Sequence, residues 1–214
     1  MSKGKPIGLL GGAFDPVHKG HIRMALGCME TLDLQEVNFI PASIPPLKSA
    51  TGTPQQHRLA MLELALRGYP RLVVNDMELK RGGVSYTIDT LIDLRRRKQQ
   101  QPLCFILGLD AFISLPAWRR WPELTDHAHL VVVDRKLQHE GCGDARLQAH
   151  YAERACSSAA ALHEHPGGFI LKMDVSVPDI SSTQIRKLLG SRQDTGNRLP
   201  PGVYDYIKEN NLYA

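Results

Sequence analysis

The chain has 214 residues, a length that suits one large domain or two small ones. Hydrophobic residues make up 43% and charged residues 22%, which excludes a disordered chain and a coiled coil. The longest aliphatic run, 130–133, is too short for a membrane span, and the basic start of the chain makes a poor signal peptide. The net charge of +4 favours anionic small molecules, but it is too small to indicate nucleic-acid binding by itself.

The cysteines carry no sign of a disulfide framework or a zinc site. Cys28, Cys104, Cys142 and Cys156 show no paired spacing, and the Cys-x₂-Cys pattern of zinc ligands is absent. With no export signal, the sequence predicts free thiols and a cytoplasmic protein.

The first half of the chain alternates predicted strands and helices. An apolar run at 7–10 predicts a buried strand that enters a glycine-rich turn. Apolar residues at spacings of three and four predict an amphipathic helix over about 19–32, and 37–40 predicts a second strand. A capping threonine, a proline suited to the first helical position and a glutamine completing a capping box predict a helix start at 53–56.

The second half continues the alternation. Short apolar runs predict further strands at 72–74, 102–107, 130–133 and 169–173. A helix can begin at Ser85 or Thr87, and closing helices are expected at 181–189 and 201–210. Between the predicted strands at 130–133 and 169–173, the segment 136–168 is rich in Gly, Ala, His and Cys. It is expected to be a variable connection with one weak helix.

This alternation predicts an α/β fold, Rossmann-like and doubly wound, with a mostly parallel sheet and helices on both faces. We expect a single domain over 1–214, with the variable connection at about 136–168 and a helical C-terminal part at about 181–214. In such folds ligands bind beyond the carboxyl ends of the strands, where the strand order reverses.

The densest chemical motif is 11–21, Gly-Gly-Ala-Phe-Asp-Pro-Val-His-Lys-Gly-His. The two glycines let the backbone approach a ligand closely, and a helix N-terminus favours an anion. His18 and His21 are three residues apart, so they share one face of the first turn. Together these features predict a phosphate site, although a lone His-x-x-His is more often a surface feature. A metal site would need more ligands, and Asp15 is the sole candidate nearby in sequence.

The motif resembles the signature of the nucleotidyltransferases that share His-x-Gly-His with class I aminoacyl-tRNA synthetases. Further segments match this family in its order, at Pro45-Pro46-Leu47-Lys48, Ser85-Tyr86-Thr87, Gly108-Leu109-Asp110, Leu115-Pro116-Ala117-Trp118 and Ile180-Ser181-Ser182-Thr183-Gln184-Ile185-Arg186. The Ser-Tyr-Thr and Leu-Pro-x-Trp motifs resemble those of the bacterial subfamily that adenylylates nicotinate mononucleotide. The resemblance covers nearly the whole chain.

The resemblance implies that His18 and His21 hold ATP phosphates and stabilise charge at the α-phosphorus. The other residues implied in ATP binding are Gly11, Gly12, Ala13, Phe14, Gly108, Asp110, Arg135, Ser181, Ser182, Thr183 and Arg186. Hydroxyls and amides at a helix N-terminus suit a triphosphate, but simple helix capping explains a Ser-Ser-Thr run equally well. Asp110 could likewise cap a helix instead of binding a ribose hydroxyl, and Arg135 could be a surface arginine.

For the acceptor, the resemblance implies that Trp118 stacks on the pyridine ring. Amides of Thr87 and Arg119 would bind its carboxylate, beside Ser85 and Tyr86, and Lys48 would lie in a loop over the site. Two positions depart from the family pattern. Position 13 is Ala instead of Thr or Ser, and position 47 is Leu instead of His, which puts a role for a loop histidine in doubt.

The implied reaction is transfer of AMP from ATP to nicotinate mononucleotide, by direct in-line attack without a covalent enzyme intermediate. Mg²⁺ is expected with ATP, held mainly by phosphates and water, and no protein metal site is expected. Nicotinamide mononucleotide or phosphopantetheine are alternative acceptors, and a non-catalytic nucleotide-binding module is a remote alternative. A redox domain is disfavoured because Gly-x-Gly-x-x-Gly is absent from the first turn. We expect no nucleic-acid or membrane partner, and a monomer or small homo-oligomer.

Overall fold

The structure is a computed structural model that describes residues 4–46, 52–134 and 143–214. Its centre is a sheet of seven parallel strands in the order β3-β2-β1-β4-β5-β7-β6. The six predicted strands are β1 (Ile7–Gly12), β2 (Glu36–Pro41), β3 (Leu72–Val74), β4 (Leu103–Gly108), β5 (His129–Asp134) and β7 (Ile170–Asp174). The short edge strand β6 (Ala155–Cys156) was not predicted.

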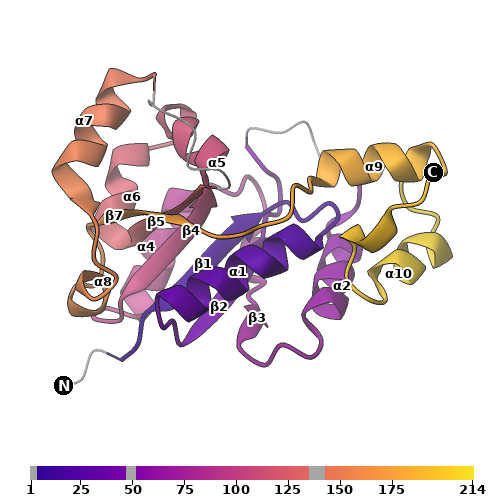
Figure 1. The fold of residues 1–214 in the computed structure, drawn as a ribbon, viewed down its shortest axis with the longest axis horizontal. Helices are drawn as coiled ribbons and strands as arrows, with labels where there is room; N and C mark the ends of the chain where they lie inside the picture. The colour runs from indigo at the N-terminus through magenta and orange to yellow at the C-terminus, as the bar shows by residue number, and fades with distance from the viewer. Residues whose placement is uncertain (1–3, 47–51, 135–142) are drawn as a thin grey trace.

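Helices cover both faces of the sheet (Figure 1). They are α1 (Lys19–Thr31), α2 (Gln55–Leu66), α3 (Met77–Arg81), α4 (Thr87–Arg97), α5 (Leu109–Ile113), α6 (Leu124–His127), α7 (Ala145–Arg154), α8 (Ala161–Glu164), α9 (Ser182–Gly190) and α10 (Val203–Glu209). Three 3₁₀ turns, η1 (Leu115–Ala117), η2 (Trp121–Glu123) and η3 (Gly196–Arg198), complete the described elements.

Two hydrophobic cores lie on opposite faces of the sheet. Successive residues of β4 alternate between them, as a strand directs neighbouring side chains to opposite sides. One core receives side chains from α1, α2, α9 and α10, and the other from α4, α5, α6 and α7. Burial on both faces explains why the strands read as continuous apolar runs, and it confirms the Rossmann-like α/β fold.

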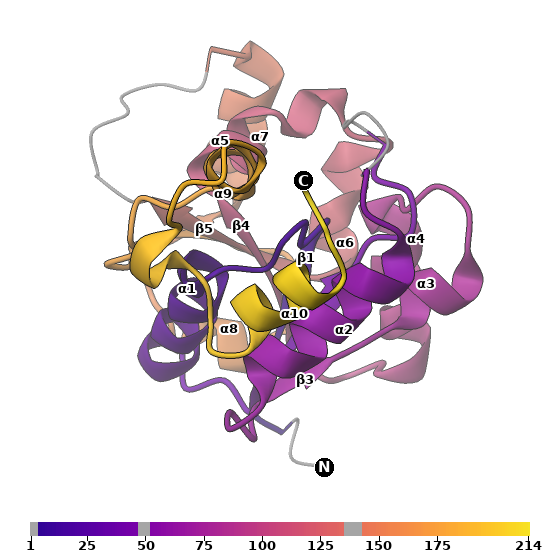
Figure 2. The same cartoon turned by 90° about the vertical axis from the view of Figure 1, so that its right-hand side faces the viewer.

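The strand order reverses between β1 and β4, which are neighbours in the sheet although β2 and β3 come between them in sequence. Their carboxyl ends therefore open side by side, which is where such folds bind ligands. Figure 1 shows α9 and α10 together at one end of the molecule, and Figure 2 shows that end facing the viewer.

Some local predictions were wrong. Helix α2 begins at Gln55 with Pro54 as its N-cap residue and no side-chain cap bond, so the expected capping box is absent. Thr53 is instead buried and hydrogen-bonded to Tyr213. The connection after β5 holds more structure than one weak helix, because α7, β6 and α8 all lie within its described part.

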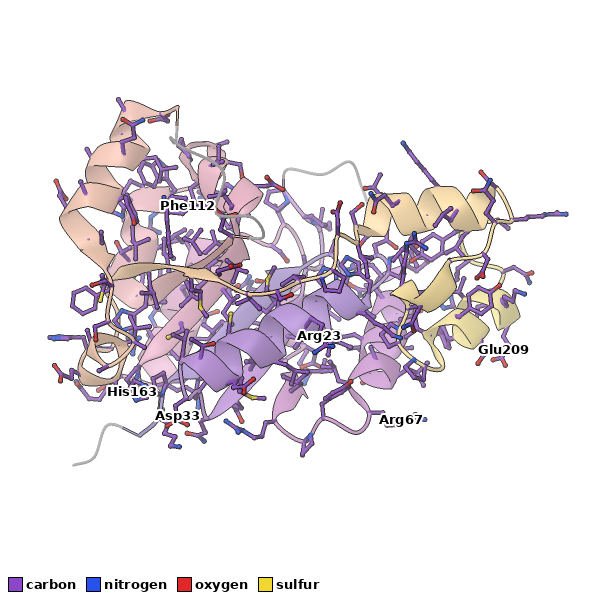
Figure 3. The ribbon with its side chains drawn as sticks, in the orientation of Figure 1. Arg23, Asp33, Arg67, Phe112, His163 and Glu209 are labelled. Carbon is purple, nitrogen blue, oxygen red and sulfur yellow. The ribbon has the colours of Figure 1, made fainter. Side chains whose placement is uncertain are left out.

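The short helix α8 is anchored to the end of α1. His163 lies close to Asp33 in Figure 3, and its Nε2 lies 3.0 Å from the carbonyl oxygen of Leu32. The helices of one or two turns, such as α3 and α5, are too short to show the periodicity on which prediction depends. No helix in the described ranges is long and apolar enough to cross a membrane.

Candidate functional site

The glycine turn after β1 leads directly into the histidine pair. Gly11 is exposed at the end of the strand, and Phe14 takes a left-handed backbone conformation (φ 49°) with its side chain buried. The Phe14 ring packs edge-on against His21, with ring centroids 5.1 Å apart, and also contacts Phe39. Phe14 therefore supports the histidine pair from the core, while Gly11 is exposed at the start of the turn.

His18 and His21 are stacked at the start of α1, as the spacing predicted. Their ring centroids lie 3.7 Å apart with an interplanar angle of 24°, and His18 is 3% exposed. The backbone N–H of His18 donates to Nδ1 of His21 over 3.2 Å. A neutral His21 therefore carries its proton on Nε2.

The glycine between the two histidines has a steric reason. A Cβ atom on Gly20 would lie 2.9 Å from Nδ1 and 3.0 Å from Cε1 of the His18 ring. Any side chain at this position would therefore displace the ring. The first turn of α1 contains no acidic residue, so the positive end of the helix dipole is not neutralised from within the helix.

The N-terminus of α9 is bound to the same turn. Arg186 Nη1 donates to the carbonyl oxygen of Asp15 over 2.6 Å, and the Ser182 hydroxyl donates to that of Pro16 over 2.9 Å. Ser181 forms a capping box with Gln184, so its hydroxyl has the capping role that the sequence left open. These bonds hold the predicted motif at 180–186 against the predicted motif at 11–21.

A buried polar cluster beneath the turn was not predicted. Arg58 is 1% exposed and donates to the carbonyl oxygens of Ala13 (2.8 Å) and Ser43 (3.1 Å). Burial lowers the pKa of Arg58, while the nearby Asp15 opposes that effect. Asp15 is itself buried and accepts a hydrogen bond from the Tyr213 hydroxyl over 2.6 Å.

The turn after β4 supplies Gly108 and Asp110. Gly108 is the N-cap residue of α5, and a Cβ atom there would meet nothing within 4 Å, so the space beside this backbone is open. The Asp110 side chain is exposed in the first turn of α5 and does not cap the helix. Helix capping, the alternative left open for Asp110, is therefore not its role in the structure.

The expected acceptor-binding residues gather at α4 and the η1–η2 segment. The Arg119 guanidinium lies 4.7 Å from the Tyr86 ring centroid, and Thr87 is the first residue of α4, whose N-cap makes no side-chain bond. Trp118 is half-buried, packs edge-on against Phe105 and donates from Nε1 to Ser114. An aromatic ring, a cation and the start of a helix thus lie at one location.

Ser85 is buried beneath this group of residues. It is buried, and its hydroxyl accepts the backbone N–H of Ser43 over 2.9 Å. It also bonds to the buried Glu78, whose pKa is raised by burial and lowered in part by the Thr90 and Ser85 hydroxyls. Ser85 therefore holds two loops together.

Two chains of contacts connect the Trp118 region with the 11–21 motif. The ring of Phe105, which packs against Trp118, lies 3.5 Å from where a Cβ of Gly11 would stand. Ser43 connects Ser85 on one side with Arg58 on the other. The predicted residues Lys48 and Arg135, and the departure at Leu47, lie outside the described residues.

Comparison with known proteins identifies the family of the chain. The model of the cytidylyltransferase-like family matches residues 9–188. A probable nicotinate-nucleotide adenylyltransferase from Aeromonas salmonicida is 42% identical over 208 residues, covering 97% of each chain. One from Pseudomonas fluorescens is 43% identical over 211 residues, covering 98% of each.

A solved structure shares the fold. Plasmodium falciparum nicotinic acid mononucleotide adenylyltransferase, complexed with APC, has a TM-score of 0.72 at 18% identity and covers 98% of both chains. At that identity the likeness concerns the fold alone. The family match over most of the chain and the full-length bacterial relatives show that this chain belongs to the cytidylyltransferase-like family of nucleotidyltransferases.

Proposed function

We propose that the chain is a nicotinate-nucleotide adenylyltransferase, which transfers AMP from ATP to nicotinate mononucleotide and releases pyrophosphate. The observation that carries the proposal is the stacked His18–His21 pair, which stands directly after the glycine turn and at the N-terminus of α1. The relatives at about 40% identity bear this enzyme's name, and the Plasmodium neighbour was also solved with NaAD.

On the ATP side, the Nε2 proton of His21 and the backbone of Gly11 to Phe14 face the phosphates. As the acceptor phosphate attacks the α-phosphorus in line, negative charge grows on the surrounding oxygens, and fixed donors stabilise it. His18, held against His21, contributes from the same face. The mononucleotide phosphate is the nucleophile, so no protein nucleophile is required.

The β- and γ-phosphates are assigned to the N-terminus of α9. The Ser181 hydroxyl accepts the Gln184 amide, the Ser182 hydroxyl donates to Pro16, and Arg186 donates to Asp15 and Thr183. The donors assigned to phosphate are therefore the backbone amides of Ser182 and Thr183 and the remaining N–H groups of Arg186. Thr183 is exposed beside them. The first turn of α9 contains no acidic residue, which favours an anion there.

On the acceptor side, Trp118 offers a ring face for the pyridine, and the amides of Thr87 and Arg119 bind its carboxylate. A carboxylate at the start of α4 gains from the helix dipole, an effect partly offset by Asp89 in the first turn, whereas a neutral carboxamide gains less. This difference favours nicotinate over nicotinamide mononucleotide. Gly108 and Asp110 are assigned to the ribose of ATP and Arg135 to a further phosphate contact, while Lys48 is assigned to the loop over the acceptor site.

We propose that Mg²⁺ binds together with ATP. In the described ranges no three His, Cys, Asp or Glu side chains are grouped so that they could hold a metal ion. We propose that Mg²⁺ is bound mainly by phosphate oxygens and water, as this ion prefers. No step is assigned to the metal beyond neutralising phosphate charge.

The test is pyrophosphate release with ATP and Mg²⁺, with nicotinate mononucleotide, nicotinamide mononucleotide and phosphopantetheine compared as acceptors. We expect release with the nicotinate substrate at the highest kcat/KM. Preference for phosphopantetheine would contradict the acceptor site, and ATP binding without release would favour a non-catalytic module.

The cytoplasm stays the expected compartment, since Cys28, Cys104 and Cys156 are free thiols in the described part of the chain.

A further inference from the structure

The segment after α10 returns to the start of the catalytic motif. The hydroxyl of Tyr213 lies 2.6 Å from Oδ1 of Asp15, a residue 198 positions earlier in the chain. Asp15 is 5% exposed and stands between the glycine turn and His18. A carboxylate so far removed from water needs partners, and a short hydrogen bond from a hydroxyl is among the stronger ones available to it.

The charges around this bond fix its direction. Burial raises the pKa of Tyr213 well above its ordinary value, and the bond to Asp15 raises it further, so the hydroxyl keeps its proton and donates it. Arg58 attracts the Asp15 carboxylate electrostatically. Thr53 also bonds to Tyr213, and Arg186 lies close enough to interact with it.

Each part of the turn is held by a different side chain. Arg58 holds the carbonyl of Ala13, Arg186 holds the carbonyl of Asp15, and Tyr213 holds the carboxylate of Asp15. The turn sets the direction in which the chain enters α1, where the His18 and His21 rings are stacked within 3.7 Å. A small change in the turn therefore moves both rings relative to the phosphates.

We propose that Tyr213 is a positioning residue for the His18–His21 pair, acting through Asp15. The inference rests on the proposed function, because the pair is assigned there to the phosphates of ATP. Tyr213 touches neither histidine in this assignment and takes no part in the chemistry.

The chain offers a matched control. The Tyr206 hydroxyl lies 2.9 Å from Nδ1 of His57 and joins α10 to α2, so this bond does not include a residue of the 11–21 motif. Tyr206→Phe removes one hydroxyl and one hydrogen bond from the same C-terminal part of the chain. A purely structural role for such bonds would make Tyr206→Phe and Tyr213→Phe behave alike.

The experiment measures kcat and KM for ATP and nicotinate mononucleotide in the full-length variants, with thermal unfolding of each. We expect Tyr213→Phe to lower kcat roughly tenfold, the rate equivalent of one hydrogen bond to a charged group, with little change in KM for nicotinate mononucleotide. Tyr206→Phe should retain the kcat of the unmodified chain. Equal kcat values in all three proteins would overturn the inference.

Amide hydrogen exchange of residues 13–21 without substrate separates this inference from the proposed function. Tyr213→Phe should exchange faster there than Tyr206→Phe, whether or not the protein turns over. If the unmodified chain releases no pyrophosphate, the proposed function fails, and unchanged exchange would independently overturn the positioning role. If Tyr213→Phe does not fold, Asp15→Asn weakens the same bond while keeping an acceptor oxygen, and an unchanged kcat in that variant would count against the inference.

Discussion

Replacing Gly20 with alanine tests whether the His18 ring must stand where the structure has it. The new Cβ would lie 2.9 Å from Nδ1, against an ordinary contact of at least 3.4 Å, so the ring must move by roughly 0.5 Å. His18 is 3% exposed and stacked on His21, so it cannot retreat without disturbing the second ring. A misplacement of this order costs about 10- to 100-fold in kcat, since an error of about 1 Å can cost about 100-fold.

The same change should have little effect on stability. Alanine is favoured over glycine within a helix by about 1 kcal/mol, and this gain offsets the roughly 0.5–1.5 kcal/mol of strain in a displaced side chain. The assay is kcat for pyrophosphate release together with urea unfolding. We therefore expect a folded protein with a slow reaction.

Gly27→Ala is the control, because it is also a glycine of α1 but lies away from the histidines. Its Cβ would stand 2.3 Å from Cγ1 of Val175, a severe overlap within the core. This variant should lose about 1–3 kcal/mol of stability while the folded protein retains its kcat. If Gly20→Ala turned over like the unmodified chain, the argument that Gly20 makes room for His18 would be refuted.

Three further predictions follow from the same geometry. His18→Ala should lower kcat about 100- to 1,000-fold without unfolding the protein, and near-normal turnover would contradict its assigned role. Arg58→Met leaves the Asp15 carboxylate and two carbonyls buried without their cation, so urea denaturation should show a loss of about 3–5 kcal/mol; a loss below about 1 kcal/mol would contradict this reasoning. His129 is buried, and burial lowers its pKa from 6.5 to about 4, so the unfolded chain binds a proton that the folded chain does not as the pH falls below 6.5. The stability from this group is thus present above pH 6.5 and should fall by about 2 kcal/mol between pH 7 and pH 5, a slope that His129→Gln should lack in denaturation curves.

The central strands β1, β4 and β5 were predictable because their burial leaves short apolar runs that end in glycine or charged residues. Long helices such as α1 and α4 were predictable for a similar reason, since their periodic apolar residues pack against the sheet. The short helices α5 and α6 depend on tertiary contacts, because one turn of helix is not stable by itself. Their positions therefore could not be read from local sequence.

Arg58 and Tyr213 were not predicted as part of the site, for different reasons. Arg58 did leave a signal, since it shares a helix face with the buried Met61, Leu62 and Ala65, and a charged residue in an apolar stripe indicates a buried partner. Tyr213 left none, because its partner Asp15 is 198 residues away. Such a pairing depends on where the chain ends relative to the sheet, which local patterns do not encode.

The motif at 11–21 combines two kinds of residue that the sequence does not distinguish. Gly12 and Gly20 make room for the rings of Phe14 and His18, since a Cβ at either position would lie 3.1 Å or less from the ring concerned. The two glycines are therefore needed for the geometry, whereas His21 and the backbone of the turn are the groups that we propose contact ATP.

The departure at position 13 can be understood in the same way. The bond from Arg58 is made to the carbonyl oxygen of Ala13, and every residue type presents that oxygen. The change from a hydroxyl side chain to alanine leaves this contact intact, along with the backbone path from Gly12 to Phe14. A substitution within the motif is consequently expected to matter most where it adds bulk beneath a ring or removes an imidazole.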